Sequence, residues 1–146
     1  MPRIIGEPSF TSLHDLLRRL KANASSVPCT LGGGAHGYVG TLLSPQAYAS
    51  LSNTAFNPPN HPGSLVIPMG STQYEIAHLK QAHKDNLSTF QNYTLMQRAL
   101  IGQLCQAVDP QYTAALRNRI TGQIPNNCRD ILLYLFRVYG LSLIHI

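Results

Sequence analysis

A long stretch without proline constrains the fold of this chain more than any other feature. No proline occurs between Thr72 and Val108, and Gly102 is the only glycine there. Thr72 and Glu75 form a capping-box pattern at its start. The large or apolar side chains that recur every three or four residues are Ile76, Leu79, His83, Leu87, Phe90, Tyr93, Gln97, Leu100, Leu104 and Val108. This spacing predicts one helix of about 35 residues, with a break at Asp85–Asn86 or at Gly102 as the alternative.

The helical seam contains two polar side chains, His83 and Gln97. A coiled-coil seam would be apolar throughout its a and d positions. We therefore expect this seam to pack against other helices of its own domain.

The segment that follows predicts two further helices. Asp109 can cap a helix that takes Pro110 in its first turn. Gly122 and Pro125 interrupt the pattern, and either Asn126 or Asn127 can cap a last helix over about 128–139 that Gly140 closes. Because this last helix is apolar almost all round, we expect it to expose apolar surface.

The first half of the chain is rich in glycine and proline. We expect residues 1–11 to be flexible and Ser12, paired with Asp15, to start a short helix. The apolar stripe of that helix consists of Leu13, Leu16, Leu17 and Leu20. Residues 24–40 are predicted as a loop, Ser44 and Pro45 start a brief helix to about Leu51, and the proline-rich connector 53–70 is predicted to be an extended strap, on the surface or disordered.

The predicted fold class follows from these elements. It is all-α: an irregular helical bundle with one long helix and a Gly/Pro-rich N-terminal half, over residues 12–140. The last six residues (141–146) resemble an in-frame translation of the transposase end sequence used in sequencing adaptors. We therefore exclude them from the expected domain and expect the chain to be truncated at its C-terminus.

Charge and cysteine content limit the function classes. Only 12% of the residues are charged and the net charge is +5. Low charge suits a protein that associates with itself, and the basic excess favours contact with polyanions. No apolar run is long enough to span a bilayer, so we expect no membrane partner. Three widely spaced cysteines, Cys29, Cys105 and Cys128, predict neither a disulfide framework nor a metal pair, and the expected localisation is cytoplasmic.

One glycine motif matches the dinucleotide fingerprint: Gly32, Gly34 and Gly37 have the GxGxxG spacing. The fingerprint needs a strand before it and a helix N-terminus after it. Neither is predicted here, because Pro28 precedes the motif and no helix opens before Ser44. We expect the glycines to permit a tight backbone crossing, with His36 packed or hydrogen-bonded locally.

No catalytic or metal-binding group is predicted. His78 and His83 are five residues apart on the long helix and point in different directions, so they cannot share one ion without a break. We expect the histidines to be free and partly exposed, and Cys105 and Cys128 to be buried and inert. We therefore expect that this chain is not an enzyme and that it has no cofactor, no metal and no small-molecule substrate.

Three segments carry a family resemblance. They are LGGGAHGYVG (31–40), LLSPQAYASL (42–51) and VDPQYTAALRNRITGQIPNNCRDILLYLFRVYG (108–140). Together they resemble the N-terminal half of Gag from copia-type LTR retrotransposons, over roughly 13–140. The loop Gly32, Gly33, Gly34, His36 and Gly37 corresponds to a recurrent GGG-x-HG feature of that family.

The resemblance implies a structural, capsid-like protein that assembles into virus-like particles and packages element RNA. Arg117, Arg119 and Arg129 are the candidate phosphate contacts, weak and salt-dependent; a solvated helix face is the other interpretation of these arginines. A stand-alone nucleic-acid-binding helical module is the alternative function, and an enzyme is the third.

Overall fold

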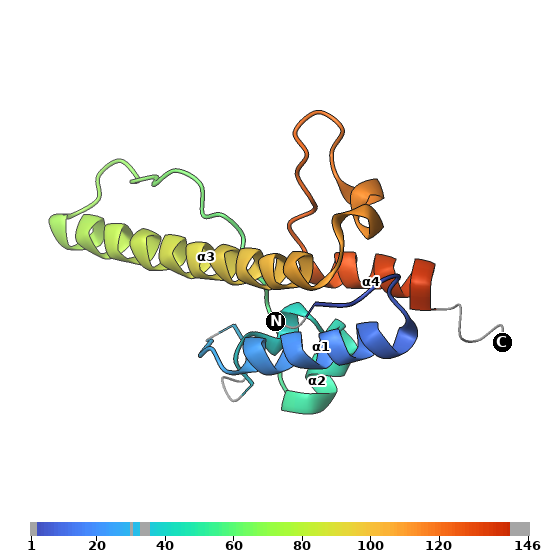
Figure 1. Cartoon of the computed structure of the whole chain (residues 1–146). Coiled ribbons are helices and arrows are strands. Elements are labelled where there is room, and N and C mark those ends of the chain that lie inside the picture. The colour runs from blue at the N-terminus through green and yellow to red at the C-terminus, as the bar shows by residue number, and fades with distance from the viewer. Residues whose placement is uncertain (1–2, 30, 33–35, 141–146) are drawn as a thin grey trace. The chain divides into compact units, whose positions relative to one another are not determined.

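Helices account for all the regular secondary structure in the described part of the chain. The computed structural model describes residues 3–29, 31–32 and 36–140, and contains no strand within those ranges. Its four α-helices there are α1 (Phe10–Ser25), α2 (Pro45–Ser52), α3 (Gln73–Ala107) and α4 (Cys128–Tyr139) (Figure 1). Three short 3-10 helices are η1 (Gly37–Thr41), η2 (Pro110–Tyr112) and η3 (Ala114–Leu116). The predicted all-α fold with one long helix is confirmed. The segment 141–146 lies outside the described residues.

The chain divides into two compact units. Unit 1 comprises Met1–Asn57 and Met96–Ile146, and unit 2 comprises Pro58–Leu95. The helix α3 continues from one unit into the other without the break considered at Asp85–Asn86 or Gly102. Its capping box is present, because Glu75 N–H donates to Thr72 Oγ1 and Thr72 N–H donates to Glu75 Oε2.

The core of unit 1 forms where α1 meets η1 and α4, with α2 against η1. The predicted stripe of α1 supplies part of it, although Leu17 is only half-buried. The buried apolar side chains of the α-helices are Leu13, Leu16, Leu20, Ala24, Tyr48, Leu100, Ile101, Leu104, Ala107, Cys128, Ile131, Leu132 and Leu135. Burial at intervals of three and four residues is what amphipathic helices around one core produce.

The start of α1 differs from the prediction. Ser9, not Ser12, is the N-cap: Ser12 N–H donates to Ser9 Oγ, and Ser9 N–H donates to Ser12 Oγ. Ser12 therefore acts as the N3 partner of a capping box, a role that its hydroxyl can fill in place of a glutamate. Asp15 forms ion pairs with Arg18 and Arg19 one turn later.

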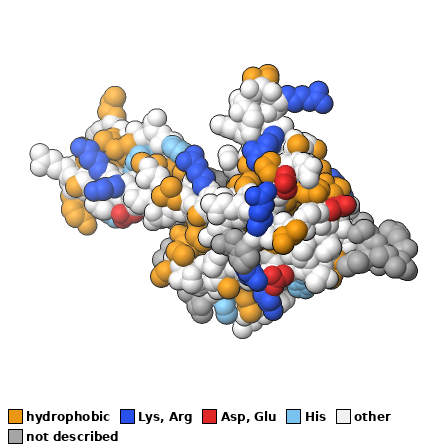
Figure 2. All heavy atoms as spheres, viewed as in Figure 1, with side chains coloured by type: hydrophobic (Ala, Val, Ile, Leu, Met, Phe, Trp, Pro, Cys, Tyr) orange, Lys and Arg blue, Asp and Glu red, His pale blue; other side chains and the backbone are white. Residues whose placement is uncertain are grey.

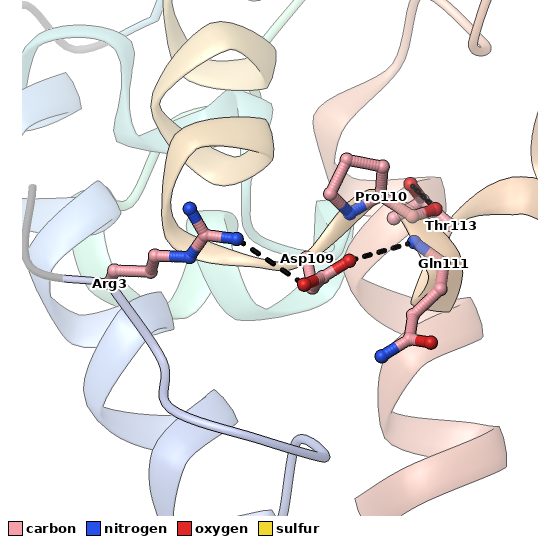
Figure 3. A network of polar contacts seen from close by, with 5 residues as sticks. All are labelled: Arg3, Asp109, Pro110, Gln111 and Thr113. Carbon is pink, nitrogen blue, oxygen red and sulfur yellow. Dashed lines mark hydrogen bonds and ion pairs between the residues drawn. The ribbon is translucent and has the colours of Figure 1, made fainter.

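The segment before α1 is tied to the end of α3. Ile4 N–H donates to the carbonyl of Ala107 at 2.6 Å. The Arg3 guanidinium lies 3.3 Å from one carboxylate oxygen of Asp109, whose other oxygen accepts from Gln111 N–H (Figure 3). Within the segment 1–11 that was predicted to be flexible, residues 3 and 4 therefore contact the chain at the end of α3, and Phe10 and Thr11 belong to α1.

The predicted helix after Asp109 does not form. Asp109 and Pro110 start only a 3-10 turn, η2, and the chain is irregular from Arg117 to Asn127. At Asn118 a local turn takes the place of helical hydrogen bonding: its side-chain oxygen accepts from Ile120 N–H and Thr121 N–H. Such a local turn occupies the N–H groups that a helix would use.

The helix α4 forms as predicted, and its cap is Asn127 rather than Asn126. Asn127 Oδ1 accepts from Asp130 N–H at 3.2 Å. One face of α4 is buried, while Leu133 and Val138 are 50% and 46% exposed. The expected exposed apolar surface is present at these two positions. Gly140 closes the helix in the right-handed region.

Unit 2 consists of the proline-rich strap and the first two-thirds of α3. The strap contacts the helix through histidines: His83 Nε2 lies 2.8 Å from the carbonyl oxygen of Gly63, and the His61 ring meets Phe90 edge to face at 5.2 Å. The strap therefore lies against the seam. The sequence predicted that other helices would pack here, whereas within unit 2 these contacts come from the strap.

Candidate functional site

In the glycine loop, another segment of backbone comes so close that only glycine fits, most clearly at Gly37. Gly37 has a φ of 54°, a left-handed conformation that glycine adopts at no steric cost. A Cβ at this position would overlap the carbonyl oxygens of Ala24, Ser25 and Val27. The expected tight crossing with positive φ is confirmed at Gly37.

Two other glycines of the loop accommodate aromatic rings. A Cβ at Gly32 would collide with the Tyr48 side chain, and a Cβ at Gly40 would collide with Phe56. The two rings pack edge to face at 5.2 Å. These glycines therefore let the backbone lie directly against an aromatic pair, which is a structural role.

The rest of the motif is only partly described. Gly33 and Gly34 lie outside the described residues, so their role in the motif is not assigned. His36 is half-buried and precedes η1, where its side chain makes no capping hydrogen bond. Its carbonyl oxygen accepts from Val39 N–H.

The polarity around Gly37 is opposite to that of a phosphate-binding loop. Gly37 faces carbonyl oxygens at the C-terminal end of α1, where the helix dipole is negative. A dinucleotide fingerprint instead presents N–H groups of a helix N-terminus to the pyrophosphate. The GxGxxG spacing is explained at Gly32 and Gly37 by packing, without a nucleotide.

The three candidate phosphate contacts lie in different environments. Arg117 is half-buried, and its guanidinium has partners within the chain. Nη1 donates to the carbonyl of Gly122 at 3.2 Å, and Nη2 lies 4.0 Å from the Cys105 sulfur. Arg119 is exposed in the loop before α4. Arg129 is half-buried in the first turn of α4.

Within the described ranges, no ion pair involves any of these three arginines, and the hydrogen bonds of Arg117 go to Gly122 and Cys105. The interpretation as a solvated helix face is wrong for Arg117 and Arg119, because neither is on an α-helix.

One polar contact inside the core was not predicted. Gln97, a polar member of the seam, is 3% exposed, and its side-chain oxygen accepts from Cys128 N–H at 3.1 Å. The amide thus satisfies one of the N–H groups that the start of a helix leaves unpaired. A polar residue at an apolar position of the seam was the only sequence signal for this contact.

Burial favours the protonated thiol at two of the three cysteines, Cys29 and Cys128. Burial raises the pKa of Cys128 to about 12, with the nearby Cys105 thiol adding to the effect. Burial also raises the pKa of Cys29, although Leu31 N–H and the Tyr38 hydroxyl act in the opposite direction. The expectation of a buried thiol is confirmed for Cys128, whereas Cys105 is only half-buried.

Two histidines of unit 2 are engaged rather than free. His83 pairs with the Gly63 carbonyl, and His61 Nδ1 accepts from Gly63 N–H at 2.9 Å. The described residues contain no cluster of three or more histidine, cysteine or acidic side chains able to hold a metal ion. None of the described helices combines the length and apolar character needed to cross a membrane.

Comparisons with protein-family models, with curated proteins and with solved structures each returned no match.

Proposed function

We propose that this chain is part of a structural, Gag-type protein of a copia-like LTR retrotransposon, which associates with itself into particles around element RNA. Three sequence segments carry the resemblance, at 31–40, 42–51 and 108–140. The all-helical fold is compatible with that proposal.

The observation that carries the self-association part is the exposure of two apolar side chains of α4. Leu133 and Val138 are each about half exposed, and because five residues separate them they lie on different sides of the helix and would make separate contacts. Figure 2 shows apolar side chains spread among uncharged polar ones, with charged groups scattered between them. Because only 12% of the residues are charged, little like-charge repulsion separates two copies.

Assembly of this kind needs no reacting pocket. Many repeated weak contacts give a particle high avidity even where each contact is weak. The polyanion contact would come from arginine side chains and would be sensitive to salt.

Sedimentation velocity over a wide range of protein concentration tests the proposal. We expect the average mass to rise with concentration. The double variant Leu133→Ser/Val138→Ser should shift this rise to higher concentration. The double variant Leu51→Ser/Ile120→Ser, which removes two exposed apolar side chains outside α4, is the matched control. A chain that stays monomeric throughout contradicts the proposal.

The alternative is a stand-alone nucleic-acid-binding helical module. It is favoured by the basic net charge of +5 alone. Tight RNA binding by a chain that remains monomeric would support this alternative and exclude the assembly function.

A further inference from the structure

Unit 2 contains a cavity where the proline-rich strap runs into α3. It has a volume of about 350 Å³ and is lined by the strap residues 68–71 and by side chains from the start of α3, including Tyr74, Glu75 and His78. The exposed fractions of Met69 and Tyr74 are 103% and 82%. Apolar surface that is gathered around a cavity marks a binding site more often than a single exposed side chain does.

A single carboxylate gives this cavity its negative charge. Among the described residues that line it, Glu75 is the only acidic one, and none is a lysine or an arginine. Glu75 Oε2 accepts from Thr72 N–H at 3.4 Å, so Oε1 can accept from a further donor. His78 adds positive charge only when it is protonated. Lys80 is five residues from Glu75 and therefore points to another side of α3.

The exposed side of α4 has the complementary pattern. Leu133 is 50% exposed, and Arg129 and Arg137 lie four residues before and after it. Residues four apart are neighbours on a helix surface, so an apolar side chain lies between two guanidinium groups. Arg137 is exposed, with its guanidinium 5.6 Å from the centre of the Tyr134 ring, and Arg129 is half-buried. Asp130 reduces the positive charge of α4 without reversing it.

The charges of the two units favour contact between unlike surfaces. In unit 2 two lysines balance two carboxylates: Lys80, Lys84, Glu75 and Asp85. The whole net charge of +5 therefore belongs to unit 1. Two copies that met through unit 1 alone would bring two positive surfaces together. A contact between unit 1 of one copy and unit 2 of another avoids that repulsion.

We propose that the cavity of unit 2 receives the Leu133–Arg137 side of α4 from a second copy of this chain. Leu133 enters beside Met69 and Tyr74, and Arg137 pairs with the Glu75 carboxylate. This inference rests on the proposed self-association and gives it a contact surface. Because the two surfaces of the contact differ, each copy offers one of each and the contact can repeat from copy to copy.

A mixing experiment followed by sedimentation velocity tests the contact. Leu133→Ser/Arg137→Glu alters the α4 surface, and Met69→Ser/Tyr74→Ser alters the cavity. Each variant alone should need an at least about tenfold higher concentration than the unaltered chain to reach the same average mass. Mixed in equal amounts, the two variants should form pairs, because each supplies the surface that the other lacks. Growth through this contact should stop at the pair.

The matched control is Val66→Ser/Ile67→Ser, which removes two exposed apolar side chains of unit 2 outside the described lining of the cavity. It should associate like the unaltered chain. Equal weakening in this control and in the cavity variant would show a general effect of apolar surface and overturn the inference. A mixture that forms no pairs, although the unaltered chain associates, overturns it as well and leaves the proposed assembly intact.

Charge reversal separates binding from folding. Glu75→Arg and Arg137→Glu should each lower the association constant by at least about fivefold. Combined in one chain, the two changes should restore most of the association, because the pair is then present with its charges exchanged. A folding defect in one variant would not be repaired by the other change. Absence of this restoration overturns the assignment.

Two outcomes distinguish this inference from the proposed function. A chain that stays monomeric at every concentration contradicts both. A chain that associates, but whose Met69→Ser/Tyr74→Ser variant associates equally well and no longer binds the apolar dye anilinonaphthalene sulfonate, contradicts only the inference. The cavity would then hold a small apolar ligand.

Discussion

Gly37 shows how much one backbone position contributes to unit 1. Its positive φ and the three carbonyl oxygens beside it both exclude a side chain. Gly122, also in unit 1, has a φ of 71°, but no atom lies within 4 Å of the position that a Cβ would take. Only the conformational strain therefore applies at Gly122.

We predict that Gly37→Ala lowers the free energy of unfolding by about 2–4 kcal/mol, from left-handed strain and overpacking together. Gly122→Ala should cost about 1–2 kcal/mol, from strain alone. Urea denaturation of both variants measures the difference. Equal losses would mean that the carbonyl cluster around Gly37 relaxes at no cost.

The buried thiol of Cys128 should make the stability of the fold depend on pH in the alkaline range. Cys128 has an unfolded pKa near 9.0 and a folded pKa of about 12. Between these values the unfolded thiol has lost its proton and the folded thiol has not, so stability falls as the pH rises from 9 toward 12. Below pH 9 this contribution is fully present.

The free energy of unfolding should therefore decline less steeply above pH 9 in Cys128→Ala than in the unaltered chain. Cys105→Ala is the control and should keep the steeper decline.

In the folded protein at pH 8, the half-buried Cys105 should react with a disulfide reagent before Cys29 and Cys128, which are buried. Fast labelling of Cys128 would contradict its burial.

The helix α4 depends on how its first turn is satisfied. Asn127 accepts from Asp130 N–H, and Gln97 of α3 accepts from Cys128 N–H. One of these contacts is local and the other is between two helices. Together the two side-chain oxygens accept hydrogen bonds from two of the N–H groups that have no partner within the helix.

We predict that Asn127→Ala lowers stability by about 1 kcal/mol, as the loss of an N-cap usually does. Asn126→Ala is the matched control, because Asn126 is one residue outside the cap and exposed, and it should have almost no effect. Thermal denaturation of the two variants measures this. A larger loss in Asn126→Ala would place the cap one residue earlier.

The two units differ most in the burial of α3. No residue from 58 to 95 is fully buried, whereas Gln97, Leu100, Ile101, Leu104 and Ala107 are. A helix without a covered face is marginally stable in water, because packing supplies most helical stability. The strap in unit 2 gives only partial cover.

Hydrogen exchange should therefore be faster along Gln73–Leu95 than along Gln97–Ala107, although both belong to one helix. Mass spectrometry of peptides from the two segments makes the comparison, with α1 as a protected reference. Uniform protection along α3 would show that the first part is stabilised as strongly as the second.

Features that depend on neighbours in the chain were predictable from sequence. Examples are the length of α3, its Thr72 capping box and the buried stripe at Leu13, Leu16 and Leu20. Helical spacing and capping act over a few residues, so the pattern contains the physical cause. The start of α1 was also within reach, because Ser9 and Ser12 have the spacing of a capping box, but the neighbouring Ser12–Asp15 pair has the same spacing.

Contacts between distant residues had no such local signal. The Gln97–Cys128 bond spans 31 positions, Gly32 and Gly40 are required by rings at 48 and 56, and Arg117 is held in part by the Cys105 sulfur. Each depends on which chain segments meet, and packing determines that. The assignment of Arg117 to a structural role comes from that packing, since spacing along the chain contains no information about it.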